Sequence, residues 1–225
     1  MSTSATAIPA PRREQTRDAL LAAALTAFAT NGYDAVRVEE VAAAAGLSVG
    51  SVYVHFESKQ GLYVATVERA FNMLDEAMAE AYDQGRSPAS QVDAAGRVYH
   101  RLAVEHPEVF RLVVLPPTHL PDTDRIRTIT DQLAQRQRAL VGRLRDALER
   151  GAADGSLQVD DAEATAWFLT AAWSGVIATM LRPDAPSGLD LDEVLAAGEA
   201  LVSRGLDARR QIVGDDYAIF LEGTP

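Results

Sequence analysis

Ser48 lies in the sequence Gly46-Leu47-Ser48-Val49-Gly50, which satisfies the G-x-S-x-G pattern of a hydrolase nucleophile elbow. That elbow requires a buried strand directly before the serine. The residues from Val38 to Ala45 are instead alanine-rich with helical spacing, and no β-branched runs elsewhere would build a sheet. The surrounding sequence therefore disfavours an enzyme of this kind, and loss of esterase activity in Ser48→Ala would be the test of it.

The sequence contains no pattern typical of a metal site, a cofactor site or another catalytic site. The histidines at 55, 100, 106 and 119 lack metal-ligand spacing, and there is no cysteine. The acidic residues are spread along amphipathic stretches, and neither a phosphate loop nor a dinucleotide fingerprint occurs. We therefore expect no catalytic residues, no metal and no cofactor, and a protein that is not an enzyme.

The same stretch has the pattern of two short helices. Apolar residues recur at i, i+3, i+4 and i+7, namely Val38, Val41, Ala42 and Ala45. Gly46 suits the end of that helix, and Ser48 suits the N-cap of a second one. Val52 and Phe56, four residues apart, give the second helix one inward face. Two short helices joined by a glycine-containing turn are typical of a DNA-reading helix-turn-helix.

With its neighbours, this stretch resembles a known family. Residues 17–65 are similar to the DNA-binding domain of the TetR family of transcriptional regulators. The shared features are the aromatic-bearing first helix before NGYDAV, the AxxxGLS turn, the YxHF end of the second short helix, and SKxxLY opening a long helix. The resemblance covers about 50 of the 225 residues.

The resemblance implies an all-α fold with two domains. Residues 1–11 are expected to form a disordered arm, residues 12–57 a three-helix helix-turn-helix DNA-binding domain, and residues 58–225 a helical effector-binding and dimerisation domain. Residues 1–60 carry five basic and six acidic side chains, so most of the net charge of −11 falls on the second domain. Charge alone would favour a solvated acidic surface over a DNA-binding one.

The resemblance also suggests which residues contact DNA. Tyr53, His55 and Lys59 match family positions that bind phosphates, and Gly50 matches one that lets the helix approach the bases. Arg37 replaces a small capping hydroxyl, so we expect Asp34 to help cap that helix. The full expected set is Arg37, Ser48, Val49, Gly50, Ser51, Tyr53, Val54, His55 and Lys59. Because the two valines lack hydrogen-bond donors, we expect few base contacts and a contribution from DNA shape.

Apolar periodicity places further helices in the second domain. The first helix of the chain is expected to end near residue 30, and the later ones to span about 58–83, 90–105, 107–115, 124–151, 161–181 and 191–205. In the longest helix, Arg136 and Gln137 interrupt the apolar stripe. That gap indicates either a helix bowing into water or a cavity. We expect an effector pocket lined by Leu74, Met78, Tyr99, Leu102, Phe110, Arg136, Gln137, Leu140 and Trp167; the family places its pocket among helices four to eight.

The last two helices are apolar on two sides, which one chain cannot cover. We therefore expect a homodimer, as in the resembling family, with Ala171, Trp173, Ser174, Ala178, Leu195, Gly198, Leu201 and Val202 at the interface. The longest mostly apolar run, residues 168–181, is too short to span a membrane. The role of residues 208–225 is not assigned.

These expectations lead to one function and one alternative. The first is a cytoplasmic DNA-binding transcriptional regulator, a repressor released from a palindromic operator by a small-molecule effector. The alternative is a ligand-insensitive DNA-binding factor controlled by a protein partner. A structure without a cavity near Tyr99 and Trp167 would favour the alternative.

Overall fold

The computed structural model describes residues 12–113, 120–182, 184–185 and 187–207. These residues form helices with no strands, apart from one isolated bridge between Leu157 and Asp207. The all-α expectation is confirmed. The expected arm at 1–11, His119 and the tail at 208–225 lie outside the described residues. No helix in the described part of the chain is long and apolar enough to cross a membrane.

The described residues contain nine helices in the expected order. Their bounds are α1 (Arg12–Ala35), α2 (Val38–Ala44), α3 (Val49–Phe56), α4 (Lys59–Ala81), α5 (Pro88–Glu105), α6 (Pro107–Val113), α7 (Asp124–Ala153), α8 (Ala162–Met180) and α9 (Leu191–Leu206). The expected break after residue 30 falls at Gly32, whose φ of 74° and ψ of 174° kink α1. Helix α5 begins two residues earlier than expected, because Ser87 caps it and a proline is tolerated in the first turn.

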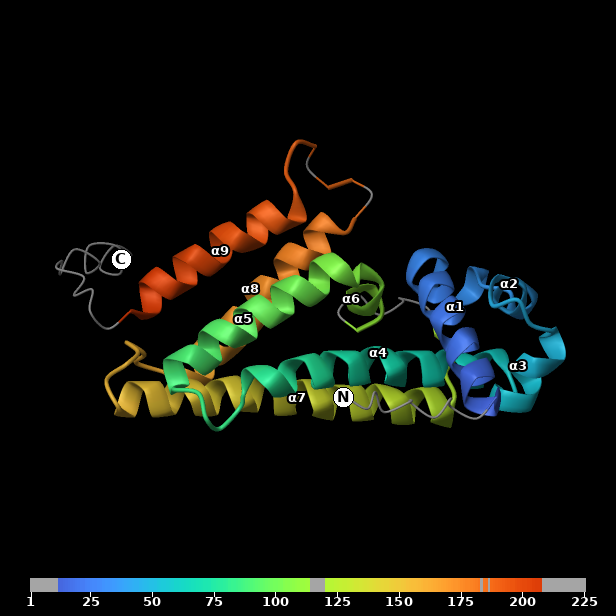
Figure 1. Ribbon diagram of the computed structural model, residues 1–225, viewed down its shortest axis with the longest axis horizontal. Coiled ribbons are helices and arrows are strands. Elements are labelled where there is room, and N and C mark those ends of the chain that lie inside the picture. The colour runs from blue at the N-terminus through green and yellow to red at the C-terminus, as the bar shows by residue number, and fades with distance from the viewer. Residues whose placement is uncertain (1–11, 114–119, 183, 186, 208–225) are drawn as a thin grey trace, which may run out of the picture.

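Figure 1 shows α1, α2 and α3 gathered at one end of an elongated molecule. Helices α4 and α7 run side by side along the long axis, and α5, α8 and α9 lie toward the other end. Helix α4 therefore belongs to both parts of the fold. We call α1, α2 and α3 the reading head.

An aromatic cluster fastens α4 to the reading head. The ring of Tyr63 on α4 meets Phe28 and Tyr33 edge-on, with ring centroids 5.1 Å apart in both cases. Tyr63 is only 3% exposed. Burial, aided by the neighbouring Tyr33, raises the pKa of Tyr63 to about 12 from the usual 10.0.

We expect this cluster to make the protein sensitive to alkali. The unfolded chain releases the Tyr63 proton near pH 10, whereas the folded chain keeps it until about pH 12. Stability from this group is therefore complete below pH 10 and lost as pH rises toward 12, by about 1 kcal/mol at pH 11. Urea unfolding at pH 8 and pH 11 should show a smaller alkaline loss in Tyr63→Phe. The half-exposed Tyr53→Phe is the control, and an equal effect in both variants would contradict the prediction.

Helices α3 and α4 approach each other unusually closely at Gly61. A Cβ atom added there would lie 2.0 Å from the carbonyl oxygen of Phe56 and 3.1 Å from its carbonyl carbon. Between the helices, Glu57 adopts φ of 66°, and Ser58 caps α4 by accepting from the Gly61 amide at 3.0 Å. Only a glycine at position 61 permits this tight junction.

Candidate nucleic-acid interface and ligand cavity

The turn between α2 and α3 has helix-turn-helix geometry. Gly46 adopts φ of 68°, and the Leu47 amide donates to the Ala42 carbonyl at 2.9 Å, closing the end of α2. The Ser48 hydroxyl then caps α3 by accepting from the Ser51 amide at 3.3 Å. The residues before Ser48 thus form a helix and not the strand that a nucleophile elbow needs. Ser48 is a capping residue, as its position in the sequence suggested.

Helix α3 has one buried and one outward face. Val52 and Phe56 are 0% and 4% exposed, while Tyr53 and Val54 are 50% and 72% exposed. Gly50 also lies on the outer surface. The half-buried residues of α3 are Val49, Ser51 and His55. The outer face of α3 therefore presents Gly50, Tyr53 and Val54 to solvent.

Two basic residues of the expected DNA-contacting set lie outside α3: Arg37 directly before α2, and Lys59 at the start of α4. Arg37 is exposed and begins α2 without any side-chain cap, and the carboxylates of Glu39 and Glu40 lie in the first turn. Those carboxylates stabilise the positive end of the α2 dipole. The expectation that Asp34 helps to cap α2 is wrong: its carbonyl oxygen instead accepts from the Lys59 ammonium at 3.0 Å.

Lys59 is anchored at the edge of the reading head. Besides its bond to the Asp34 carbonyl, its ammonium lies 4.8 Å from the centre of the Tyr33 ring. An ammonium has three donors, so one contact with a carbonyl leaves donors for a phosphate. These two contacts fix the position of the Lys59 charge at the edge of the reading head.

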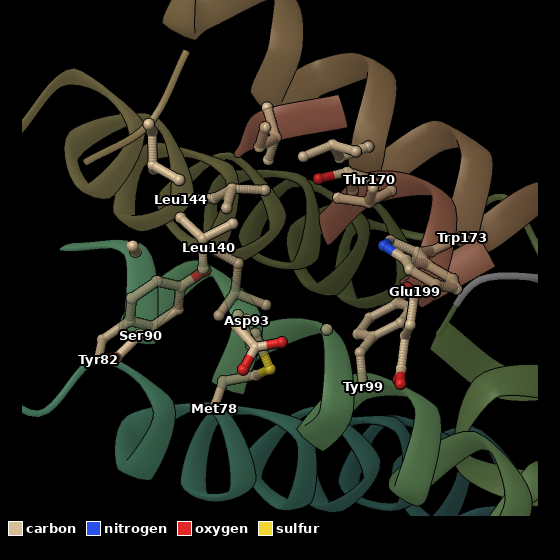
Figure 2. Close-up of a pocket in the computed structure, with 18 of the residues that line it drawn as sticks. Met78, Tyr82, Ser90, Asp93, Tyr99, Leu140, Leu144, Thr170, Trp173 and Glu199 are labelled. Carbon is tan, nitrogen blue, oxygen red and sulfur yellow. The ribbon is translucent and has the colours of Figure 1, made fainter. Parts of the chain in front are cut away.

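A cavity of about 770 Å³ lies in the other half of the molecule, among α4, α5, α7, α8 and α9. Figure 2 shows side chains from these helices converging on it. Of the residues expected to line a pocket, five do so: Leu74, Met78, Tyr99, Gln137 and Leu140. The size suits a small organic molecule.

Four residues expected in the pocket do not line it, so the prediction was wrong for them. Leu102 and Phe110 are packed into the core. Arg136 points to α4, where it pairs with Asp75, donates to the Asn72 amide oxygen at 2.8 Å and covers the Phe71 ring. Trp167 is 43% exposed and donates to Glu163 at 2.8 Å on the same helix. The two polar residues that interrupt the apolar stripe of α7 thus have different surroundings: Arg136 contacts α4, whereas Gln137 lines the cavity.

Tyr99 lines the cavity, and its hydroxyl has a partner on another helix. Its hydroxyl shares a hydrogen bond of 3.1 Å with Ser174 on α8, and its ring meets Phe110 edge-on at 4.7 Å. Burial raises the pKa of Tyr99 above its ordinary value. The hydroxyl therefore stays protonated and neutral at physiological pH.

Several lining residues were missed by sequence reasoning, among them Asp93, Thr170, Trp173 and Glu199. The expectation stopped at the eighth helix, but α9 also lines the cavity. Apolar periodicity could not predict that α9 lines the cavity, because it identifies two apolar faces of the helix but not what each face packs against.

The expected dimer face needs correction for the same reason. Leu195 is fully buried within the single chain, and Trp173 and Val202 line the cavity. Gly198 packs under Trp173, whose ring atoms would lie 3.1 Å from an added Cβ, and Ser174 bonds to Tyr99. The inner sides of α8 and α9 are thus covered by their own chain. Of the residues expected at the dimer interface, Ala171 and Leu201 are exposed and Ala178 is half-buried. Phe168, which was not in the expected set, is 70% exposed.

Comparison with known proteins places this architecture. Residues 20–66 match the family model of bacterial regulatory proteins of the tetR family, and residues 92–202 match the tetracyclin repressor-like C-terminal domain. The chain belongs to the TetR family and is a DNA-binding transcriptional regulator.

Individual relatives agree with that assignment. The transcriptional repressor NicS of Pseudomonas putida is 26% identical over 164 residues, 71% of this chain and 74% of that protein. The structure of the ketosteroid regulator KstR2 of Mycobacterium tuberculosis has a TM-score of 0.67 at 22% identity, covering 85% of this chain and 94% of that one. The structure of AibR with isovaleryl coenzyme A and operator DNA has a TM-score of 0.64 at 19% identity, covering 81% and 95%.

Proposed function

We propose that the protein is a homodimeric repressor that binds a pseudo-palindromic operator and is released when a small molecule enters the cavity. The observation that carries the proposal is the presence, in one chain, of an outward recognition face on α3 and a cavity of about 770 Å³ along the same long helix α4. The cavity reaches Tyr99, so the alternative of a ligand-insensitive factor is not favoured.

The exposed apolar residues of α8 and α9 support the dimer. Phe168 is 70% exposed, Leu201 is 65% exposed and Trp167 is 43% exposed. A second copy of the chain would cover them by an isologous contact. Two recognition helices related in this way read half-sites spaced by about one DNA turn, roughly 34 to 36 Å.

Helices α4 and α7 each contact both the cavity and the reading head, so they can couple ligand binding to the position of the head. Leu74 and Met78 on α4 line the cavity, and Tyr63 on the same helix packs against the head. Leu140 on α7 lines the cavity too, while near the start of that helix Arg125 lies 3.5 Å from Glu57, directly after α3. A ligand that binds one arrangement of α4 and α7 better than another would shift the heads away from operator spacing.

Affinity selection from random DNA duplexes, titrated at two salt concentrations, tests the DNA half of the proposal. The intact protein should enrich a palindrome. Tyr53→Ala should weaken binding about tenfold with a smaller salt slope, and Val54→Ala should relax the preference at single base pairs.

Val104→Ala is the matched control, because Val104 is also an exposed valine, 42% accessible, but lies on α5. It should bind like the intact protein. Enrichment of no sequence by the intact protein, or equal losses in Val54→Ala and Val104→Ala, would rule out α3 as the reading element.

A further inference from the structure

The cavity carries a charge pattern that restricts its ligand. Its described lining includes the carboxylates of Asp93, Asp154 and Glu199, and no lysine, arginine or histidine is among the lining residues that the structure describes. A cavity lined by acidic and not by basic side chains raises the local concentration of cations and lowers that of anions.

Glu199 is held in place by a neighbouring histidine. Its Oε1 lies 2.9 Å from Nδ1 of His100, whose Nε2 lies 2.8 Å from Asp192. One imidazole thus faces two carboxylates, so the cluster contains more acidic than basic side chains. Asp93 pairs with Arg97, which is exposed and does not line the cavity.

Two aromatic rings lie beside Glu199. Figure 2 shows Tyr99, Trp173 and Glu199 together at one end of the cavity. Separate contacts join the three helices there: Tyr99 bonds to Ser174, Gly198 packs on Trp173, and His100 bonds to Glu199. Aromatic faces next to a carboxylate are a favourable setting for an organic cation.

Apolar side chains also line the cavity. Met78, Leu140, Leu144 and Leu169 form its wall, and Figure 2 shows Leu140 and Leu144 away from the Trp173 end.

We propose that the cavity selects a largely apolar small molecule with one positive charge, such as an amine or quaternary ammonium compound, whose cation lies beside Glu199, Tyr99 and Trp173. The inference rests on the proposed function of the cavity as the effector site. It sets this chain apart from AibR, whose structure holds the anionic isovaleryl coenzyme A.

Three probes with the same ten-carbon tail test the charge preference: decyltrimethylammonium, 1-decanol and decanoate, each below its micelle concentration. Decanoyl coenzyme A serves as a second anion. Fluorescence of Trp173 reports binding in a Trp167→Phe background, since the chain has two tryptophans. We expect the cation to bind about tenfold more tightly than the alcohol, and both anions to bind more weakly than the alcohol.

Glu199→Gln identifies the residue responsible, because glutamine keeps an acceptor for His100 and removes the charge. It should weaken the cation about tenfold and leave 1-decanol unchanged. Unchanged 1-decanol binding also shows that the variant folds. Glu193→Gln on the outer side of α9 is the control and should change neither ligand.

Each result bears on a different part of the argument. Equal binding of all probes, or tighter binding of either anion, would overturn the charge preference and leave the cavity as an effector site. If Glu199→Gln left the affinity for the cation unchanged, the placement of the cation beside Glu199 would be overturned. If no probe bound, the inference would be overturned. The proposed function would be contradicted only if, in addition, the cavity-filling variant Gly96→Phe bound DNA and released it like the intact protein in the presence of every compound tested.

Discussion

Replacing Gly61 with alanine is expected to lower the free energy of unfolding by about 3 kcal/mol. The new Cβ would lie 2.0 Å from the Phe56 carbonyl oxygen, a distance that no relaxation of side chains relieves because the obstacle is backbone. The α3–α4 junction must open, moving Lys59 and the capped start of α4. Operator binding should fall with it. Chemical unfolding and DNA titration measure the two effects.

Gly142→Ala is the control for that change. Gly142 lies within α7, and an added Cβ there meets no atom within 4 Å. Alanine is the better helix former, so the control should gain about 0.5 to 1 kcal/mol. If Gly61→Ala were as stable as the intact protein, the close approach of α3 and α4 would not exist in solution.

Filling the cavity is expected to abolish its ligand binding while sparing DNA binding. Gly96 lies within α5 on the cavity wall, and an added Cβ meets nothing within 4 Å. In Gly96→Phe the ring would extend into that open space and compete with any ligand. We expect decyltrimethylammonium, or any effector found by screening, to bind about 100-fold more weakly. Operator affinity without ligand should stay within about twofold of the intact protein.

Gly96→Ala is the control that separates the effect of filling the cavity from the effect of losing the glycine. It adds one carbon atom, should stabilise α5 by about 0.5 to 1 kcal/mol and should leave ligand affinity nearly unchanged. Fluorescence titration and thermal unfolding of both variants measure this. Ligand-induced operator release that persists unchanged in Gly96→Phe would place the effector outside this cavity.

Local sequence determined the reading head and the order of the helices. Val52 and Phe56 could be assigned inward because four-residue spacing defines one helix face, and Ser48 and Ser58 were recognisable as caps from their type and position. Gly46 could be assigned to the turn because few other residues adopt a positive φ. These features depend on interactions within a few residues, so the sequence alone contains them.

The tertiary structure decided which apolar and polar residues face which partner. Arg136 could not be placed from the stripe of α7, because its role depends on Asp75, 61 residues earlier in the chain. Leu195 and Trp173 had the pattern of a dimer face, yet they pack inside the single chain against residues of other helices. Helical periodicity fixes which residues share a face, but only the packing of distant helices determines whether that face meets the core, a cavity or another molecule.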